Sequence, residues 1–175
     1  MEHIDYKDVV TFHGHSCPGL AIGYKASIAA NKNNFYKSED EELIAIVENN
    51  SCSVDAIQYI LSCTFGKGNL FFRDYGKQAF TIIKRKTRES IRISLKPIDR
   101  EKLSRDEFFN LIMQSNTKDI FNIKKFKVAE DEIPQKARIH QSIICENCEE
   151  PTMETRIKHF NGKKFCIECY DKSVK

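Results

Sequence analysis

The chain has 175 residues, of which 41% are hydrophobic and 30% are charged, and its formal net charge is +3. This composition is typical of a globular protein, and the length allows one ordinary domain with a small appendage. No apolar run reaches the roughly 18 residues that a membrane span needs, so we expect no transmembrane helix.

The N-terminal residues carry acidic side chains where a secretory signal would carry basic ones, so we expect a cytoplasmic protein. Charge is uneven along the chain, because residues 67–128 hold 16 basic and 7 acidic side chains, a net charge of +9. A solvated sheet face explains this charge most simply. The alternative explanation is that these basic residues bind an anionic substrate or a nucleic acid.

The predicted helices each begin with a recognisable start signal. Pro18 suits a first helical turn, and Ser53 and Ser104 are suitable N-caps. Apolar periodicity and these signals predict helices over 18–33, 53–63 and 104–115. Runs rich in β-branched residues predict strands over 43–49, 78–86, 90–97 and 121–128, with a hairpin joining the second and third, and residues 69–76 predict a strand followed by a turn. The predicted fold class is α+β, with helices packed on a mostly antiparallel sheet.

Residues 129–137 are charged, contain Pro134 and lack periodicity, which is typical of a linker between domains. We therefore predict an α+β core domain over residues 1–135. A small zinc-binding domain, a ribbon or treble clef, follows over residues 136–175.

Four of the seven cysteines form two C-x-x-C pairs near the C-terminus, separated by 17 residues. The two pairs are Cys145 with Cys148 and Cys166 with Cys169. This spacing is typical of a structural zinc site in which four thiolates bind one tetrahedral ion. The intervening residues predict a hairpin with Asn161 and Gly162 at its turn. A redox disulfide pair is the alternative. Metal binding would contribute folding free energy to so small a segment.

The stretch FHGHSCPGL places His13, His15 and Cys17 at alternating positions. In an extended chain these side chains share one side, which gives two imidazoles and one thiolate suited to zinc, nickel, copper or iron. Cys17 and Cys52 each precede a predicted helix, where the helix dipole favours the thiolate. We therefore predict a second metal site that also includes Cys52. The alternative is that these side chains are unrelated and that each has its own hydrogen-bond partners.

Two further features lie after the second predicted helix. A helix over residues 52–63 would separate Cys52 from Cys63 by roughly 16 Å, so both cannot bind one ion, and we expect Cys63 to be a buried small side chain. The segment GKGN places Lys67 between two glycines, where it could meet a phosphate or a carboxylate. An ordinary turn is the alternative, because the P-loop pattern is incomplete.

The blocks FHGHSCPGLAIGYKAS and ENNSCSVDAIQYILSCTFGKGNLFFRDYGKQAF resemble the FmdE family of formylmethanofuran dehydrogenase subunits over roughly residues 10–82. The C-terminal cysteine segment looks like the zinc-ribbon tail of some members. The resemblance implies a dimeric α+β core with a cleft that contains histidine and cysteine side chains. The residues of this sequence that match the positions of the family's motifs are His13, His15, Cys17, Cys52, Lys67 and Asn69.

The family is associated with the complex that reduces carbon dioxide to formylmethanofuran in methanogens. The resemblance therefore implies a metal-dependent redox or one-carbon enzyme component, or an accessory protein that docks onto a larger dehydrogenase. In the first case, Cys17, Cys52 and Lys67 would be catalytic, and Lys67 and Asn69 would bind substrate. The expected cofactors are structural zinc and a second transition metal, which would be zinc, nickel or iron. We also expect a homodimer.

A metal-responsive regulator whose zinc ribbon contacts nucleic acid or a protein partner is the alternative function. Nucleic acid is the less favoured partner, because residues 129–175 carry a net charge of −1. The sequence contains no G-x-G-x-x-G motif and no C-x-x-C-x-x-C spacing, so we do not expect an electron carrier.

Overall fold

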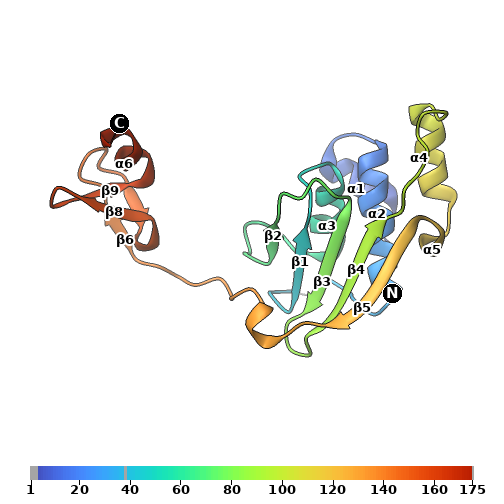
Figure 1. Cartoon of the computed structure of the whole chain (residues 1–175), viewed down its shortest axis with the longest axis horizontal. Helices are drawn as coiled ribbons and strands as arrows, with labels where there is room; N and C mark the ends of the chain where they lie inside the picture. Colours follow the sequence, from blue (N-terminus) through green and yellow to red (C-terminus); the bar gives the residue numbers. More distant parts are fainter. Residues whose placement is uncertain (1–3, 38, 175) are drawn as a thin grey trace. The chain divides into compact units, whose positions relative to one another are not determined.

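The computed structural model describes residues 4–37 and 39–174. The chain divides into two compact units, Met1–Ala137 and Arg138–Lys175, which we call the core domain and the tail. The division falls in the predicted linker, close to the predicted boundary after residue 135. Most helices and strands of both units are labelled in Figure 1.

The core domain is an α+β structure in which helices precede and follow strands. Its helices are α1 (Tyr6–His13), α2 (Pro18–Asn31), α3 (Ser53–Leu61), α4 (Arg105–Gln114), α5 (Thr117–Ile120) and the 3₁₀ turn η1 (Glu130–Glu132). Its strands are β1 (Leu43–Val47), β2 (Leu70–Phe72), β3 (Ala79–Lys84), β4 (Glu89–Leu95) and β5 (Phe121–Lys127).

The five strands form one mixed sheet in the order β2-β1-β3-β4-β5. The pairs β1–β3, β3–β4 and β4–β5 are antiparallel, whereas β2 pairs with β1 in parallel. The sheet is therefore mostly antiparallel, as predicted, with one parallel edge. Every residue of β1 is buried, because this strand lies inside the sheet and is covered on both faces.

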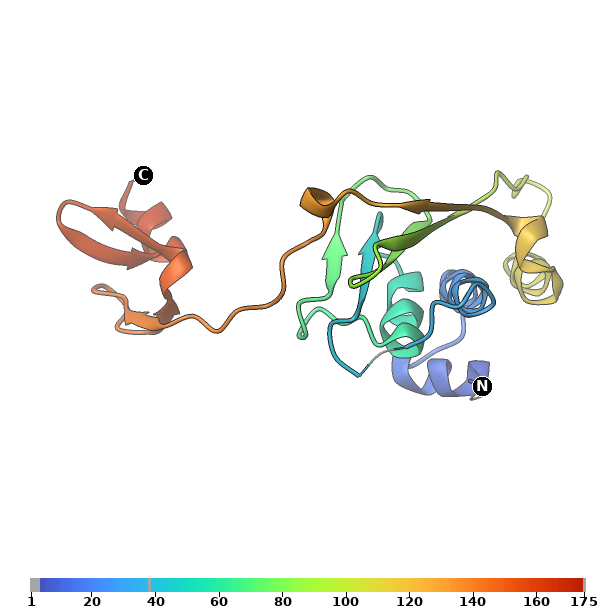
Figure 2. The same cartoon turned by 90° about the horizontal axis from the view of Figure 1, so that it is seen from below.

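Helices α2 and α3 cover one face of this sheet, and α1 packs on these two helices (Figures 1 and 2). The main core lies between that face and the helices, and includes Leu20, Ile57, Phe80, Ile91 and Ile93, all almost fully buried. A smaller apolar cluster on the opposite face contains Ile44, Ile46, Ile83 and Val128. Burying these side chains supplies most of the driving force for folding.

The predicted helix starts are confirmed at two positions. Pro18 is the first residue of α2, where its missing N–H costs nothing. Ser104 caps α4 with a full capping box, since its hydroxyl accepts from the Glu107 N–H and the Glu107 carboxylate accepts from the Ser104 N–H. The bounds of α3 and α4 also lie close to those predicted.

The tail consists of two hairpins and a helix. Its elements are β6 (Ser142–Ile144), β7 (Pro151–Met153), the 3₁₀ turn η2 (Glu154–Arg156), β8 (Ile157–Phe160), β9 (Lys163–Cys166) and α6 (Ile167–Ser173). Strands β6 and β7 pair, as do β8 and β9, both antiparallel. The second hairpin turns at Asn161 and Gly162, whose positive φ angles of 49° and 75° suit a two-residue turn.

One prediction about the first residues was wrong. Residues 13–17 were expected to be extended, but His13 is the last residue of α1, a helix that was not predicted. Gly14 then ends the helix with φ of 96°, in the left-handed region that favours glycine. Within the described ranges, no helix combines the length and apolar character needed to cross a bilayer.

Candidate metal centre

The ends of α1 and α2 place the first three predicted ligands. Gly14 turns the chain out of α1 by donating its N–H to the Val10 carbonyl at 2.7 Å, so His13 stays on the helix and His15 follows the turn. Cys17 then caps α2, and its Sγ accepts the Leu20 N–H at 3.3 Å. The turn at Gly14, rather than strand alternation, brings the two imidazoles together, with ring centroids 4.5 Å apart.

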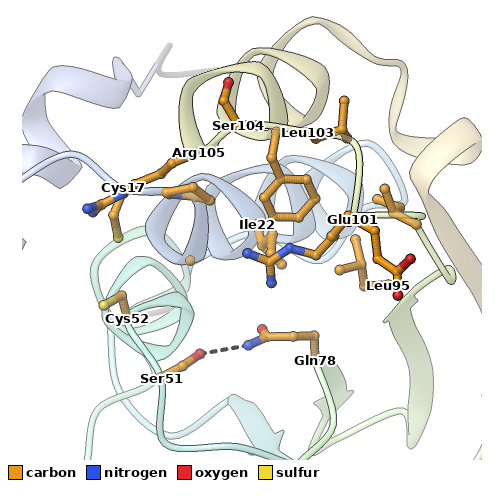
Figure 3. Close-up of a pocket in the computed structure, with 15 residues that line it drawn as sticks. Cys17, Ile22, Ser51, Cys52, Gln78, Leu95, Glu101, Leu103, Ser104 and Arg105 are labelled. Atoms are coloured by element: carbon orange, nitrogen blue, oxygen red, sulfur yellow. Dashed lines mark hydrogen bonds between the residues drawn. The ribbon is translucent and has the colours of Figure 1, made fainter.

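The fourth ligand, Cys52, comes from the N-terminus of α3, which packs closely against α2. A Cβ atom at Gly23 would lie 2.1 Å from the Ser53 carbonyl oxygen, so only glycine allows this approach. A Cβ at Gly19 would lie 3.8 Å from Cys17 Sγ and 3.9 Å from Cys52 Sγ. Two glycines on one face of α2 thus let the N-terminus of α3 bring its thiol beside Cys17 (Figure 3).

The four predicted donors meet in one group. One ligand atom from each of His13, His15, Cys17 and Cys52 lies within 4.8 Å of the others. His13 Nδ1 lies 2.7 Å from Asp55 Oδ2, whereas His13 Nε2 is buried without any hydrogen-bond partner. A carboxylate on one ring nitrogen and an unpaired second nitrogen are typical of a metal-binding histidine. The donor set, two imidazoles and two thiols, suits a transition metal. The residues therefore fit the expected ion.

The pKa of Cys52 corrects part of the prediction. Burial, together with the hydrogen bond and charge of the neighbouring Cys17, raises the pKa of the Cys52 thiol. The side chain makes no capping hydrogen bond to α3, and Cys52 has helical rather than extended backbone angles. The expectation that the helix dipole favours its thiolate was therefore wrong for the metal-free pair. Two adjacent thiols resist double ionisation unless a cation lies between them.

A pocket of about 840 Å³ opens beside the two thiols (Figure 3). Its lining comes from the N-termini of α2 and α3, the end of β4 and the segment that leads into α4. The lining residues are Cys17, Pro18, Gly19, Ile22, Ser51, Cys52, Gln78, Leu95, Ile98, Arg100, Glu101, Leu103, Ser104, Arg105 and Phe108. Its volume lies in the range of small-molecule sites. The metal group therefore adjoins a space that a small molecule can enter.

The predicted substrate-binding residues do not line this pocket. Lys67 Nζ donates to Ser62 Oγ at 2.9 Å and to the Glu39 carbonyl at 3.4 Å. Asn69 is fully buried, donates to the Leu43 carbonyl and accepts the Thr64 N–H. These contacts hold the turn between α3 and β2.

The remaining cysteine of the core domain is separate from the metal group. Cys63 is fully buried, and its Sγ lies 3.7 Å from the Leu61 carbonyl oxygen. Burial raises the pKa of its thiol to about 12.

Sequence reasoning missed three contributors to the centre. Asp55 follows Cys52 by three residues, a spacing that places both side chains on the same face of a helix and was a signal in the sequence. The role of Gly23 depends on a tertiary contact between two helices. Gln78 hydrogen-bonds Ser51 and Ser53 on either side of Cys52, at 2.8 and 2.9 Å, a link across 25 residues or more that no local pattern reveals.

The tail cysteines form a second group. One Sγ atom from each of Cys145, Cys148, Cys166 and Cys169 lies within 4.8 Å of the others. Backbone N–H groups of Cys148 and Cys166 lower the pKa of the Cys145 thiol to about 6, which favours the thiolate that zinc requires. The Cys166 Sγ accepts the Cys169 N–H at the start of α6. Four thiols in this arrangement are suited to structural zinc.

Comparison with known families agrees with the predicted family and with the zinc site of the tail. A family model described as FmdE, molybdenum formylmethanofuran dehydrogenase operon, matches residues 12–143. Because this match covers most of the chain, the chain belongs to the FmdE family. A model for the prokaryotic dksA/traR C4-type zinc finger matches residues 141–175. The predicted family and the zinc-binding tail are therefore confirmed.

Two individual proteins are similar to this chain. A probable S-adenosyl-L-methionine-binding protein of Archaeoglobus fulgidus is 29% identical over 187 residues, which cover 90% of this chain and 50% of that protein. The chain thus spans about half the length of this curated relative. The crystal structure of a tungsten formylmethanofuran dehydrogenase FmdE-like protein from Syntrophus aciditrophicus matches with a TM-score of 0.73 and 24% identity. The match covers 98% of this chain and 95% of that one, and it shows a shared fold.

Proposed function

We propose that the core domain binds a transition metal through His13, His15, Cys17 and Cys52 and acts on a small molecule in the adjoining pocket. In this proposal the protein is a component of a cytoplasmic redox or one-carbon enzyme system, and the zinc in the tail is structural. The expected homodimer and docking to a larger dehydrogenase remain part of the proposal.

One observation carries the proposal. His13 Nε2 is buried and unpaired, His13 belongs to the group of two imidazoles and two thiols, and Asp55 binds the other ring nitrogen. An unpaired buried polar atom costs roughly 1–3 kcal/mol, so a fold that keeps one needs a partner for it. A metal ion bound by the four side chains supplies that partner. Asp55 would then hold the ring tautomer whose Nε2 lone pair faces the ion.

The pocket distinguishes an enzyme component from a purely structural metal protein. Structural sites are closed, whereas catalytic sites adjoin a space for water or substrate. Here both thiols line the pocket, and its other walls combine apolar side chains with polar and charged ones. A bound metal would supply Lewis-acid or redox chemistry at this end of the pocket.

The Archaeoglobus relative supports the one-carbon part of the proposal. That protein is described as a probable S-adenosyl-L-methionine-binding protein, and this compound is a donor of one-carbon groups. The pocket volume of about 840 Å³ is large enough for a ligand of that size. We therefore place the substrate in the pocket beside Cys17 and Cys52 rather than at Lys67 and Asn69.

Metal analysis of variants tests the proposal. The full chain should bind two ions, one at each cysteine-containing group. The double variant Cys17→Ser, Cys52→Ser should lose one ion and keep the tail zinc. Cys63→Ala is the matched control, because it removes a buried thiol outside both groups, and it should keep both ions. An unchanged metal content in the double variant would reject the core site.

A further inference from the structure

Two arginines in the wall of the pocket have no acidic partner among the residues that the structure describes. Arg100 lies before α4 and Arg105 is its first residue, and both line the same pocket as Cys17 and Cys52. Arg105 and the two cysteines are labelled in Figure 3. Neither forms a salt bridge with any residue in the described part of the chain. The pocket therefore holds two guanidinium groups whose donors are available to a ligand.

The Arg100 guanidinium is held in place by an aromatic ring. Its central carbon lies 4.4 Å from the ring centroid of Phe108, a side chain that is only 3% exposed. A guanidinium stacked on a ring keeps its N–H groups in the plane, where they can bind a carboxylate or a phosphate through two parallel hydrogen bonds. Arg100 is thus oriented before any ligand arrives, which lowers the entropic cost of binding.

Arg105 is positioned by the same helix that carries Phe108. The capping box at Ser104 and Glu107 fixes the first turn of α4, so the Arg105 backbone has a defined direction. The Glu107 carboxylate is already bound to the Ser104 N–H at 2.8 Å. Glu101 is the single acid among the lining residues, against two arginines, so the lining carries a net positive charge.

The rest of the pocket wall is apolar or uncharged. Ile22, Leu95, Leu103 and Phe108 provide hydrocarbon surface, and Ser51 and Gln78 are hydrogen-bonded to each other. A ligand that fits these surfaces has an anionic end for the arginines and an apolar body. It also has a reactive group that can reach the thiol end of the pocket.

We propose that the pocket binds an organic anion, a carboxylate or phosphate on an apolar or aromatic body, whose charged group pairs with Arg100 and Arg105. The inference rests on the proposed function in one respect, because it takes the metal group as the reactive end of the same pocket. It assigns the role of anion binding to two arginines of the segment before α4 and its first turn. Lys67, the cation singled out in the sequence, donates to Ser62 and Glu39 instead.

Equilibrium binding of phenyl phosphate and phenylacetate to the full chain, measured by calorimetry, tests this inference. At least one of the two anions should bind, and benzyl alcohol, the neutral probe with a similar body, should bind at least tenfold more weakly. Arg100→Gln and Arg105→Gln should each lower the affinity for the anion at least tenfold. Arg138→Gln, which removes an exposed arginine outside the pocket, should leave the affinity for the anion unchanged.

Two results would overturn the inference: equal binding of the neutral probe, or anion binding that survives in both arginine variants. Arg105→Gln keeps the test valid if loss of the Arg100 stack disturbs folding, because Arg105 makes no such stack in the described chain. Metal content, measured on the same samples, separates this inference from the proposed function. If the anion binds through the arginines but only the tail ion is present, the proposed metal site is contradicted and the anion site is not. If two ions are present but anion binding does not depend on the arginines, the anion site is contradicted and the metal site is not.

Discussion

The two cysteine-containing groups of this protein have the same number of ligands but different surroundings. In the core domain, His13, His15, Cys17 and Cys52 are placed by three helices that pack on a five-stranded sheet. In the tail, three of the four cysteines, Cys145, Cys166 and Cys169, are themselves part of the apolar cluster, together with Phe165, Phe160 and Tyr170. The core domain would fold around its site, whereas the tail has little to bury apart from its ligands.

This difference is the one we expect between the proposed functional site in the core domain and the structural zinc site in the tail. The core group has an outer carboxylate, Asp55, and opens into a pocket. In the tail group, the Sγ atoms accept hydrogen bonds from backbone N–H groups and from the Asn147 amide, which donates to Cys169 Sγ at 3.3 Å. In a structural zinc site the protein ligands fill every coordination position, whereas a catalytic site keeps a position that water or substrate can reach. Metal removal and three single substitutions test this contrast.

The largest effect is expected from metal removal. A strong chelator should unfold the tail while the core domain stays folded, because metal binding to small four-ligand domains supplies about 10–16 kcal/mol. Amide hydrogen exchange along the chain measures both units at once. Cys166→Ser should reproduce the loss in the tail alone. Protected tail amides in the chelated protein would show that the hairpins are stable without zinc.

A buried glycine should be the next most sensitive position. Gly23→Ala should destabilise the core domain by about 3 kcal/mol or more, since its Cβ would lie 2.1 Å from the Ser53 carbonyl oxygen. It should also lower the metal affinity of the core site by moving α3, which carries Cys52. Gly66→Ala is the matched control, because its Cβ meets no atom within 4 Å. Urea unfolding compares the two variants, and equal midpoints would contradict the close packing of α2 and α3.

Asp55→Asn should lower the affinity of the core site for its metal about 10- to 100-fold, because the substitution removes the carboxylate that orients His13. Competition with a chromophoric chelator measures the affinity, and the tail zinc should be unaffected. Asp74→Asn changes an exposed aspartate outside the site in the same way and should have no effect. An unchanged affinity in Asp55→Asn would mean that the carboxylate does not support the ligand.

The smallest effect is expected at Gln78, whose amide hydrogen-bonds the hydroxyls of Ser51 and Ser53. Gln78→Ala should cost about 0.5–3 kcal/mol of stability, because partly buried hydroxyls lose a partner. Thermal unfolding measures the change. Gln114→Ala, at the exposed end of α4, should change the stability far less. A larger loss for Gln114 than for Gln78 would contradict the supporting role of this network.

Much of this arrangement could be predicted from local signals. Pro18 and Ser104 marked helix starts, and the spacing of the tail cysteines indicated a shared ion, because these features depend on a few neighbouring residues. The parallel pairing of β2 could not be predicted, since a three-residue strand carries no periodicity. The fold of the first helix also escaped prediction, because His13, Gly14 and His15 fit an extended segment as well as a helix end.

The functional details depended on tertiary contacts. Asp55 meets His13 across 42 residues, and the Arg100 guanidinium stacks on Phe108 only once α4 is formed. Lys67 stood out in the sequence because glycines flank it, yet it contacts Ser62 and Glu39 in its own domain. Composition and spacing thus indicate which residues can bind a metal, but not which groups orient the metal ligands.

X-ray absorption at the zinc edge of the fully zinc-loaded chain tests the central claim most directly. With two histidines and two cysteines at the core site and four cysteines in the tail, the averaged spectrum should show three sulfur ligands for each protein nitrogen. The Cys17→Ser, Cys52→Ser variant should then show sulfur alone. A wild-type spectrum without any nitrogen ligand would contradict the account, because the metal would be bound by the tail only.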